Sequence, residues 1–274
     1  MLDAAAISAI ADSTDEAQTA AHTIAKFTDR WPDMTIDDGY AVQDELLRRW
    51  QGRGRVLAGL KAGLTSKAKM EQMGVDVPSF GMLMADTADP DGGTVPYDRL
   101  IHPRAEAEIA FVTKADLAGP EVTFEQILAA TDFVQPAVEI IDSRFEKFKF
   151  DLESVVADNG SSARFVMGGR PRRAEELSLD TIGIVLERNG EPVAMASSAA
   201  VLGHPLRAIQ MLVGWLHTRG RVLPAGSIVL TGAATEAVPV APGDFVAARF
   251  QDLGTVSFRM GHRTAPSAPQ GGDA

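Results

Sequence analysis

The spacing of apolar positions predicts helices in the first part of the chain. Residues 3–29 are rich in alanine and carry apolar residues at helical spacing, which predicts a helix. A second helix is predicted within residues 34–54, where Thr35 can act as the N-cap and Asp38 follows three residues later. Together these patterns indicate an N-terminal helical region over residues 1–55.

Further along the chain the pattern changes to short apolar runs that are typical of strands. The predicted strands are residues 55–64, 106–112, 136–142, 227–232, 244–250 and 254–260. A hairpin is predicted over residues 181–197, because Asn189-Gly190 is a strong signal for a two-residue turn. Helices are predicted over residues 66–74, over residues 123–134 with Thr123 as N-cap, and over residues 205–220.

The order of these elements predicts an α+β protein. A β-rich catalytic body with helices packed on it is expected over residues 56–263, followed by a low-complexity, flexible tail over residues 264–274. No glycine-rich phosphate loop follows a strand, which argues against a doubly wound nucleotide-binding fold.

Composition and charge exclude several classes of function. The chain has 274 residues and a formal net charge of -11, so it offers little to neutralise the phosphates of a nucleic acid. It contains no cysteine, which excludes thiol catalysis, disulfides and thiolate zinc sites. The N-terminus lacks the basic start of a secretory signal, and no apolar run has the roughly 18 residues of a membrane helix. We therefore expect a cytoplasmic protein without a membrane partner.

The stretch "HPRAEAEIAFV" places two carboxylates on one face of a predicted strand. Side chains alternate in a strand, so Glu106 and Glu108 point the same way and should repel each other. A third acid, Glu139, lies on another predicted apolar strand that can return beside the first. Three converging carboxylates suit Mg²⁺ or Mn²⁺. A lone Glu-x-Glu pair is more often a solvated strand face, so the metal site depends on the third acid.

Two other segments are unusual for a protein surface. Lys61 lies in the middle of a predicted strand, where a buried lysine needs a carboxylate partner or has a lowered pKa. The alternative is an exposed strand lysine. Residues 158–162 place small polar groups, including Ser161, between two apolar runs, where they could donate hydrogen bonds to a substrate carboxylate. The alternative there is an ordinary polar turn.

Several stretches, taken together, resemble one family. They are "GLKAGLTSKAKMEQMGV", "LIHPRAEAEIAFVTK", "VEIIDSRFEKFKFDLESVVADNGSSARF", "AAVLGHPL" and "TGAATEAVPVAPGDFVAARFQDLGTVS". These segments are similar to the hydratase/decarboxylase branch of the fumarylacetoacetate hydrolase superfamily, over about residues 30–260. The resemblance implies a mixed β-barrel-like body of that type with a helical N-terminal region. Ordered motifs over this length are far more specific than the Glu-x-Glu pair alone.

The resemblance also assigns roles to individual residues. It implies metal ligands at Glu106, Glu108 and Glu139, an active-site lysine at Lys61, and a substrate-contacting serine at Ser161. In this reading Lys61 attracts the distal carboxylate or the developing charge, and the serine orients the bound acid. At position 160 the chain has glycine where the family usually has alanine.

Two activities of the meta-cleavage breakdown of aromatic compounds are implied within the branch. One is decarboxylation of 2-oxo-3-hexenedioate (4-oxalocrotonate), and the other is hydration of 2-hydroxypentadienoate. Hydratases usually carry "PDFG" eighteen residues after the lysine, whereas this chain reads "PSFG" with Ser79 at that position, which favours the decarboxylase. Ser79 is included among the expected substrate-binding residues.

Other functions stay open at this stage. An inactive scaffold subunit of a mixed complex is the non-enzymatic alternative, although the retained lysine and acids count against it. A hydrolase of the acylpyruvate type would need an acid/base near the metal, such as a His-Glu pair, that cannot be placed here. The resemblance further implies a 2-oxo dicarboxylic acid as substrate, a homo-oligomer, and a possible complex with a related hydratase.

Overall fold

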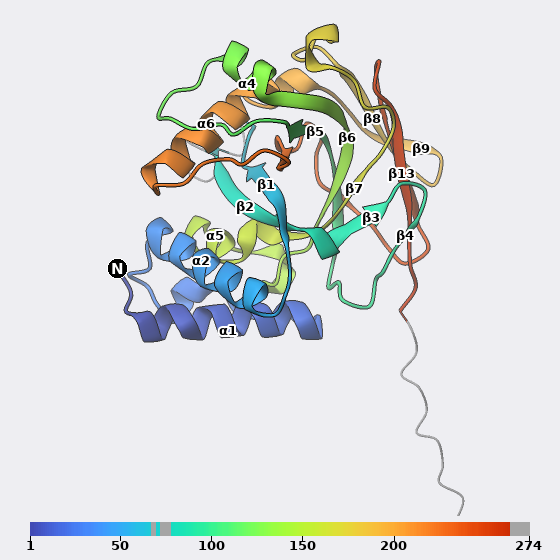
Figure 1. The fold of residues 1–274 in the computed structure, drawn as a ribbon. Coiled ribbons are helices and arrows are strands. Elements are labelled where there is room, and N and C mark those ends of the chain that lie inside the picture. Colours follow the sequence, from blue (N-terminus) through green and yellow to red (C-terminus); the bar gives the residue numbers. More distant parts are fainter. Residues whose placement is uncertain (67–69, 72–77, 264–274) are drawn as a thin grey trace, which may run out of the picture.

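The computed structural model describes residues 1–66, 70–71 and 78–263. Helices lie on two sides of a β-sheet body, with α1, α2 and α5 gathered on one side and α4 and α6 on another (Figure 1). The α-helices are α1 (Ala4–Ala20), α2 (Ile36–Gly52), α4 (Phe124–Ala130), α5 (Leu152–Ala157) and α6 (Pro205–Thr218). The 3-10 helices are η1 (Phe27–Asp29), η2 (Ala85–Thr87), η3 (Glu146–Phe148), η4 (Asn159–Ser161), η5 (Ala174–Glu176) and η6 (Ser198–Ala200).

Two sheets form the body in the described part of the chain. The larger has the order β2-β1-β10-β5-β6-β7-β3, with β11 also paired to β5. Its strands are β1 (Leu57–Gly63), β2 (Ser79–Met84), β3 (Ala88–Pro90), β5 (Arg104–Thr113), β6 (Thr131–Ile141), β7 (Ser162–Met167), β10 (Ile228–Leu230) and β11 (Val238–Pro239). The smaller has the order β4-β13-β12-β8-β9. Its strands are β4 (Thr94–Val95), β8 (Gly183–Arg188), β9 (Glu191–Ser197), β12 (Phe245–Phe250) and β13 (Gly254–Met260).

Two pairings in the larger sheet position the residues of interest. Strands β5 and β6 are antiparallel over ten residue pairs from Arg104↔Ile141 to Thr113↔Thr131, which fixes every side chain along both strands. Strand β1 is parallel to β10, with Lys61 beside Leu230, and antiparallel to β2, with Gly63 opposite Ser79. The lysine strand and the acid strand therefore belong to one sheet, separated by β10.

The N-terminal helices are joined to the body by a shared core. Ile10 of α1 and Trp50 of α2 are buried in the same hydrophobic cluster as Phe80 of β2. The Gln43 side chain donates hydrogen bonds to the carbonyl oxygens of Phe80 and Val156, at 2.9 and 2.7 Å, and so ties α2 to both β2 and α5. Because a buried amide must be satisfied, these bonds fix how the helices sit on the sheet.

Several local predictions are confirmed. Thr35 caps α2 in a capping box with Asp38, and Thr123 caps α4 in the same way with Gln126. The Asn189-Gly190 turn joins β8 to β9, and α6 begins at Pro205. The predicted α+β class with a helical N-terminal region is also confirmed. The body is two open sheets in the described residues, not a closed barrel.

Two predicted helices are too long, and one lies mostly outside the described residues. The first ends at Ala20, because Ala21 adopts the left-handed conformation, and only a 3-10 turn follows. The helix predicted over residues 123–134 stops at Ala130, and its last four residues begin β6. Most of the helix predicted over residues 66–74, and the whole of the tail, lie outside the described residues. The boundary at residue 55 stays a prediction.

Candidate active site

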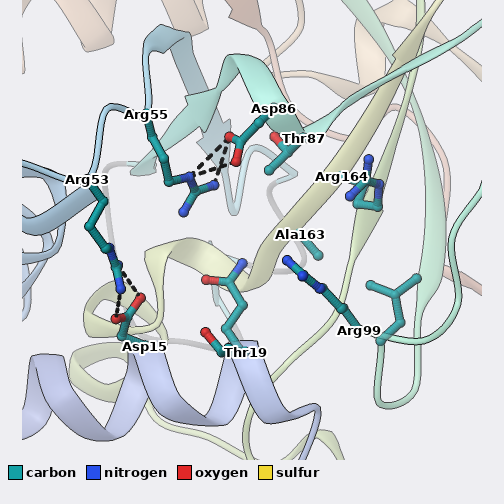
Figure 2. Close-up of a pocket in the computed structure, with 11 residues that line it drawn as sticks. Asp15, Thr19, Arg53, Arg55, Asp86, Thr87, Arg99, Ala163 and Arg164 are labelled. Carbon is teal, nitrogen blue, oxygen red and sulfur yellow. Dashed lines mark hydrogen bonds and ion pairs between the residues drawn. The ribbon is translucent and has the colours of Figure 1, made fainter. Parts of the chain in front are cut away.

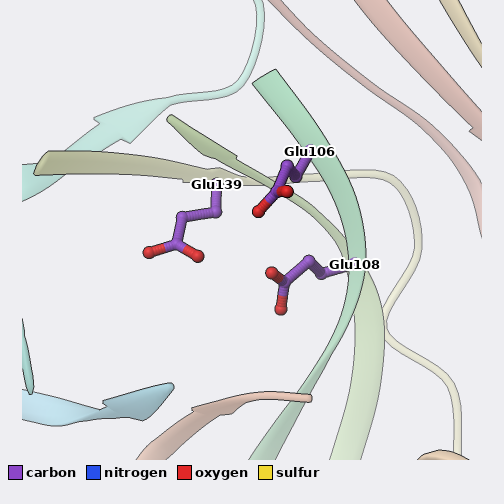
Figure 3. A group of neighbouring side chains, drawn as sticks. All are labelled: Glu106, Glu108 and Glu139. Atoms are coloured by element: carbon purple, nitrogen blue, oxygen red, sulfur yellow. The ribbon is translucent and has the colours of Figure 1, made fainter. Parts of the chain in front are cut away.

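Three glutamates meet inside the larger sheet, as predicted. Glu106 on β5 lies directly opposite Glu139 on β6, and Glu108 follows two residues later on the same face of β5. One carboxylate oxygen from each lies within 4.8 Å of the others, and all three residues are buried. Figure 3 shows the three side chains turned toward a common space between the strands.

Burial makes this cluster electrostatically unfavourable on its own. Desolvation raises the pKa of Glu108 well above its usual range, and the charge of Glu139 adds to the effect. Desolvation also raises the pKa of Glu139, while Lys61 opposes the shift. Carboxylates that are packed together away from water need a compensating positive charge.

The hydrogen-bond inventory of the cluster fits a cation. Oε2 of Glu108 accepts a 2.7 Å hydrogen bond from the backbone N–H of Gly232, but its Oε1 has no partner in the described residues. Oε1 of Glu139 is also buried without a hydrogen-bond partner there. Buried polar atoms are almost always satisfied, so two such oxygens in one cluster suit the binding of a cation. An all-oxygen donor set suits a hard divalent cation such as Mg²⁺.

Gly232 can donate to Glu108 only because it is glycine. Its φ is +100°, and a Cβ at this position would lie 2.2 Å from the Thr65 hydroxyl oxygen. No other residue can adopt this backbone conformation and fit this space without displacing Thr65. The glycine therefore holds one oxygen of Glu108 and leaves the other free to bind an ion.

Lys61 is the cation that the chain itself supplies to the cluster. Its Nζ donates to Oε2 of Glu139 at 2.9 Å and to the carbonyl oxygen of Gly160 at 3.1 Å. Burial alone would lower the pKa of this lysine, but the charges of the three glutamates raise it overall, so the ammonium stays protonated. Lys61 is therefore a buried lysine with a carboxylate partner, one of the two possibilities expected from the sequence, and not an exposed strand lysine.

Ser161 ends a tight turn in which three consecutive residues have positive φ. The φ angles of Asn159, Gly160 and Ser161 are 53°, 61° and 58°. Such angles are unfavourable for non-glycine residues, and the asparagine is held by two bonds to Met82. Its Oδ1 accepts from the Met82 N–H at 2.7 Å, and its Nδ2 donates to the Met82 carbonyl oxygen at 3.0 Å. This clamp fixes the carbonyl of Gly160 against the lysine.

The glycine at position 160 has a local consequence. A Cβ there would lie 3.3 Å from Cε of Lys61, a tight contact, at a backbone φ that disfavours side chains. Glycine therefore leaves the lysine slightly more room than alanine would.

Sequence reasoning missed a buried ion pair that supports this turn. Arg144 pairs with the carboxylate of Asp158 and also donates to the Asp142 carbonyl oxygen at 2.6 Å. Asp158 in turn accepts a 3.3 Å hydrogen bond from the hydroxyl of Ser161. Burial raises the pKa of Asp158 to about 6, with Arg144 opposing the shift. The signal that could have found it is the charged "DSR" sequence directly after a buried strand.

A cavity of about 270 Å³ opens next to the acid cluster. Lys61, Ser79, Glu106 and Ser161 line its polar part, so the structure brings these predicted site residues together, with Glu108 and Glu139 adjoining. The remaining wall is largely apolar, with Ile141, Phe148, Phe150 and Val155 among its residues. A small, mostly apolar cavity with a few convergent polar groups is typical of a small-molecule site.

His102 does not line this cavity. Its ring Nε2 is 2.7 Å from the carbonyl oxygen of Ser143, and its ring packs 5.0 Å from that of Phe148. These contacts give His102 a structural role.

A second cavity, of about 240 Å³, lies apart from the glutamates and is lined by arginines (Figure 2). Arg53 is paired with Asp15, and Arg55 with Asp86. Arg99 and Arg164 also line it, but none of the three glutamates does. Its guanidinium groups are mostly neutralised by aspartates, and it lacks a reactive group beside them, so the acid-lined cavity is the candidate active site.

The site thus combines a buried acid triad and a lysine within the larger sheet. A model of the "Fumarylacetoacetate (FAA) hydrolase C-terminal" family matches residues 57–260. The chain belongs to the fumarylacetoacetate hydrolase family, which confirms the resemblance seen in its motifs.

Particular relatives narrow the comparison. The chain is 53% identical to 4-oxalocrotonate decarboxylase of Pseudomonas sp. (strain CF600), over 92% of this chain and 96% of the relative. It is 39% identical to 2-keto-4-pentenoate hydratase of Paraburkholderia xenovorans (strain LB400), over 90% and 91%. The solved structure of 4-oxalocrotonate decarboxylase from Pseudomonas putida G7, complexed with magnesium and adipate, superposes with a TM-score of 0.93 at 50% identity, covering 95% of this chain and 99% of that one.

Proposed function

We propose that the chain catalyses metal-dependent decarboxylation of 2-oxo-3-hexenedioate, giving 2-hydroxypenta-2,4-dienoate and carbon dioxide. The observation that carries the proposal is the buried triad of glutamates, with two unpartnered oxygens, beside Lys61 at a small-molecule cavity. The higher identity to relatives named decarboxylase than to those named hydratase supports the choice of reaction.

Glu106, Glu108 and Glu139 would hold the divalent cation, which we propose to be Mg²⁺ or Mn²⁺. When bound, such a cation supplies Lewis-acid polarisation of an oxygen on the substrate. The magnesium in the related structure supports this assignment. The glutamates themselves fix the position of the cation because their strands are held in register by β5–β6 pairing.

The other residues bind and orient the substrate in this proposal. Decarboxylation breaks the bond between the distal carboxylate carbon and its neighbour, and the electron pair moves through the double bond to the 2-oxo oxygen. Lys61 keeps a protonated ammonium beside the acid cluster, where it favours the negative charge that develops on the 2-oxo oxygen. Ser161 lines the same cavity and would orient the bound acid.

Ser79 separates this reaction from hydration. It lies on β2 opposite Gly63 and lines the same cavity as the lysine. A hydratase must deliver a proton to carbon and activate water, which requires a group that titrates near working pH. A serine does not titrate there, whereas decarboxylation releases carbon dioxide without a base at that point.

The direct test is incubation of the purified protein with 2-oxo-3-hexenedioate and Mg²⁺, followed by product identification. We expect carbon dioxide and the dienol, with turnover abolished by EDTA and restored by Mg²⁺ or Mn²⁺. Full turnover in thoroughly chelated protein would disprove the metal dependence. Release of no carbon dioxide, with fast hydration of 2-hydroxypentadienoate, would overturn the decarboxylase in favour of the hydratase.

The substitution Ser79→Asp tests the role of the serine. Its new carboxylate would repel a substrate that carries two negative charges, so we expect slower decarboxylation, and any gain in hydration should be slight. The variant Ser79→Ala is the matched control, because it removes the hydroxyl without adding charge. Equal losses in both variants would show that size, and not charge, matters at this position.

We further propose that the chain forms a homo-oligomer and can assemble with a related hydratase that consumes its product. Co-expression followed by size-exclusion chromatography tests this, and separate elution at micromolar concentrations would count against the mixed complex. None of the described helices is long and apolar enough to cross a bilayer. The cytoplasmic location stays a prediction.

A further inference from the structure

Arg104 is a charged residue of the cavity to which the sequence assigned no role. It lies on β5 two residues before Glu106 and therefore on the same face of the strand. Its side chain lines the cavity, with the guanidinium carbon 4.3 Å from the centroid of the Phe148 ring. Stacking on an aromatic ring orients the guanidinium and leaves its N–H groups available at the edge.

Arg104 has no ion-pair or hydrogen-bond partner in the described residues apart from this ring. Some other arginines are paired with acids, such as Arg144 with Asp158, Arg164 with Asp89 and Arg55 with Asp86. Arg104 is one of several that have no acid partner in the described residues, and it lines the cavity that also holds Lys61 and Glu106. Its charge is therefore available to a ligand.

The other cation of the cavity is already engaged. Lys61 donates to Glu139 and to the carbonyl of Gly160, which places its ammonium at the acid cluster. Arg104 lies further along β5, about 7 Å from Glu106 in strand length. The cavity thus has a metal-binding end and, beyond it, a separate cationic group beside an apolar wall.

We propose that Arg104 binds the carboxylate at the far end of the substrate and so selects dicarboxylic over monocarboxylic 2-oxo acids. This inference rests on the proposed function for the identity of the diacid. Of the two roles expected for Lys61, the distal carboxylate and the developing charge, it leaves the second to the lysine, which is paired with Glu139 at the acid cluster. The planar guanidinium fork matches a carboxylate and can bind both of its oxygens.

The chemistry of the reaction predicts how Arg104 should affect the kinetic constants. As the carbon–carbon bond breaks, its electron pair stays on the dienolate and the carboxylate leaves as neutral carbon dioxide. The arginine then loses its charged partner, so its interaction is stronger in the bound substrate than in the transition state. Removing such an interaction raises KM without a comparable loss of kcat. The apolar wall of Phe148 and Phe150 suits the neutral carbon dioxide that is released.

The test compares two unreactive probes, 2-oxoadipate and 2-oxohexanoate, which share a head group and differ in the distal carboxylate. Their dissociation constants would be measured by calorimetry with saturating Mg²⁺. In the unmodified protein 2-oxoadipate should bind at least tenfold more tightly. Arg104→Gln should remove most of this preference by weakening 2-oxoadipate binding alone. In steady-state assays it should raise KM for 2-oxo-3-hexenedioate by at least tenfold and change kcat less than threefold.

Two further variants make the result decisive. Arg99→Gln is the matched control, because this arginine lines the second cavity (Figure 2), and it should leave the preference unchanged. Arg104→Lys keeps the charge without the planar fork and should give an intermediate preference for 2-oxoadipate. It therefore tests the role of the arginine even if Arg104→Gln fails to fold.

Three outcomes would overturn the role of Arg104. They are an unchanged preference in the folded variants, an equal loss of both probes, and a fall in kcat with KM unchanged. Failure of the proposed function is distinguishable, since it would show as absence of carbon dioxide release in the unmodified protein while the probe preference is still lost in Arg104→Gln. That result would support the diacid site without the decarboxylation.

Discussion

Carboxylates behave in opposite ways in two regions of this molecule. On α2, Glu45 accepts hydrogen bonds from Arg48 and Arg49, which hold its pKa at about 2. In the interior of the larger sheet, burial raises the pKa of Glu108 and of Glu139. The ionised form of a glutamate is thus stabilised on α2 and destabilised in the interior of the larger sheet.

The difference lies in how the carboxylate oxygens are satisfied. Glu45 is paired with two arginines, whereas in the triad the ammonium of Lys61 is paired with Glu139. Two buried oxygens of the triad, one of Glu108 and one of Glu139, have no hydrogen-bond partner in the described residues. The arginines satisfy the carboxylate of Glu45, whereas these two oxygens remain available to a cation.

The largest expected effect comes from removing one interior charge. Glu108→Gln keeps the size of the side chain but not its charge, and Lewis-acid catalysis is worth several kcal/mol. We expect decarboxylation to fall about a thousandfold or more, since each factor of ten corresponds to about 1.4 kcal/mol. Glu45→Gln on α2 is the matched control and should keep its activity. The measurement is the decarboxylation rate of each variant at saturating Mg²⁺. Comparable rates in Glu108→Gln and Glu45→Gln would refute the proposed difference between the two carboxylates.

The next effect concerns Lys61, the cation that is bonded to the triad. Lys61→Met leaves Glu139 buried without its partner, and breaking a buried pair costs about 3 kcal/mol or more. We expect this loss of unfolding free energy in EDTA and a much smaller one in saturating Mg²⁺, because the metal compensates the acids. Turnover should be lost under both conditions. A stability loss of the same size with and without Mg²⁺ would mean that no cation shares the site.

Binding of Mg²⁺ should itself stabilise the unmodified protein. At a concentration 100-fold above Kd, a ligand of the folded state adds about 2.7 kcal/mol. In a chain of this size that gain corresponds to a rise in Tm of roughly 5–10 °C. Thermal denaturation with and without EDTA measures it, and Glu108→Gln should show a smaller rise. An identical rise in that variant would place the stabilising ion elsewhere.

The smallest effect belongs to the helical layer and depends on pH. The pKa of Glu45 in the folded protein, about 2, is below its ordinary value of 4.5. Its pairs therefore stabilise the fold fully above pH 4.5, and this contribution is lost as the pH falls through 2. Exposed pairs of this kind are worth less than about 1 kcal/mol. Urea unfolding should show Glu45→Gln less stable than the unmodified protein at pH 7, with the gap closing at low pH.

The sequence predicted those parts of the site that depend on local pattern. The alternation of β5 placed Glu106 and Glu108 on one face, and the return of β6 brought Glu139 opposite the first. Caps such as Thr35, and the Asn189-Gly190 turn, were found for the same reason, because their signals lie within a few residues.

The remaining features depend on contacts between distant segments. The helix predicted over residues 123–134 was too long because apolar residues that enter a strand can also match a helical spacing over one turn. The pairing of Arg144 with Asp158, and the lack of an acid partner for Arg104 among the described residues, could not be deduced, since a sequence does not show which charges meet. The left-handed turn at Asn159 is stabilised from Met82, far away in the chain.

The parallel pairing of β1 with β10 determines the order in which the strands of the active site can pair during synthesis. Lys61 lies beside Leu230, so the lysine strand cannot take its place until the last part of the chain exists. At a ribosomal rate of about 5–20 residues per second, the interval between these two positions is roughly 10–30 s. The acid strands β5 and β6 are neighbours in the chain and can pair much earlier. During synthesis the strands that carry the three glutamates can therefore pair before β10 exists to fix the position of Lys61. A nascent chain that stops short of β10 contains the glutamates but lacks the strand that positions the lysine.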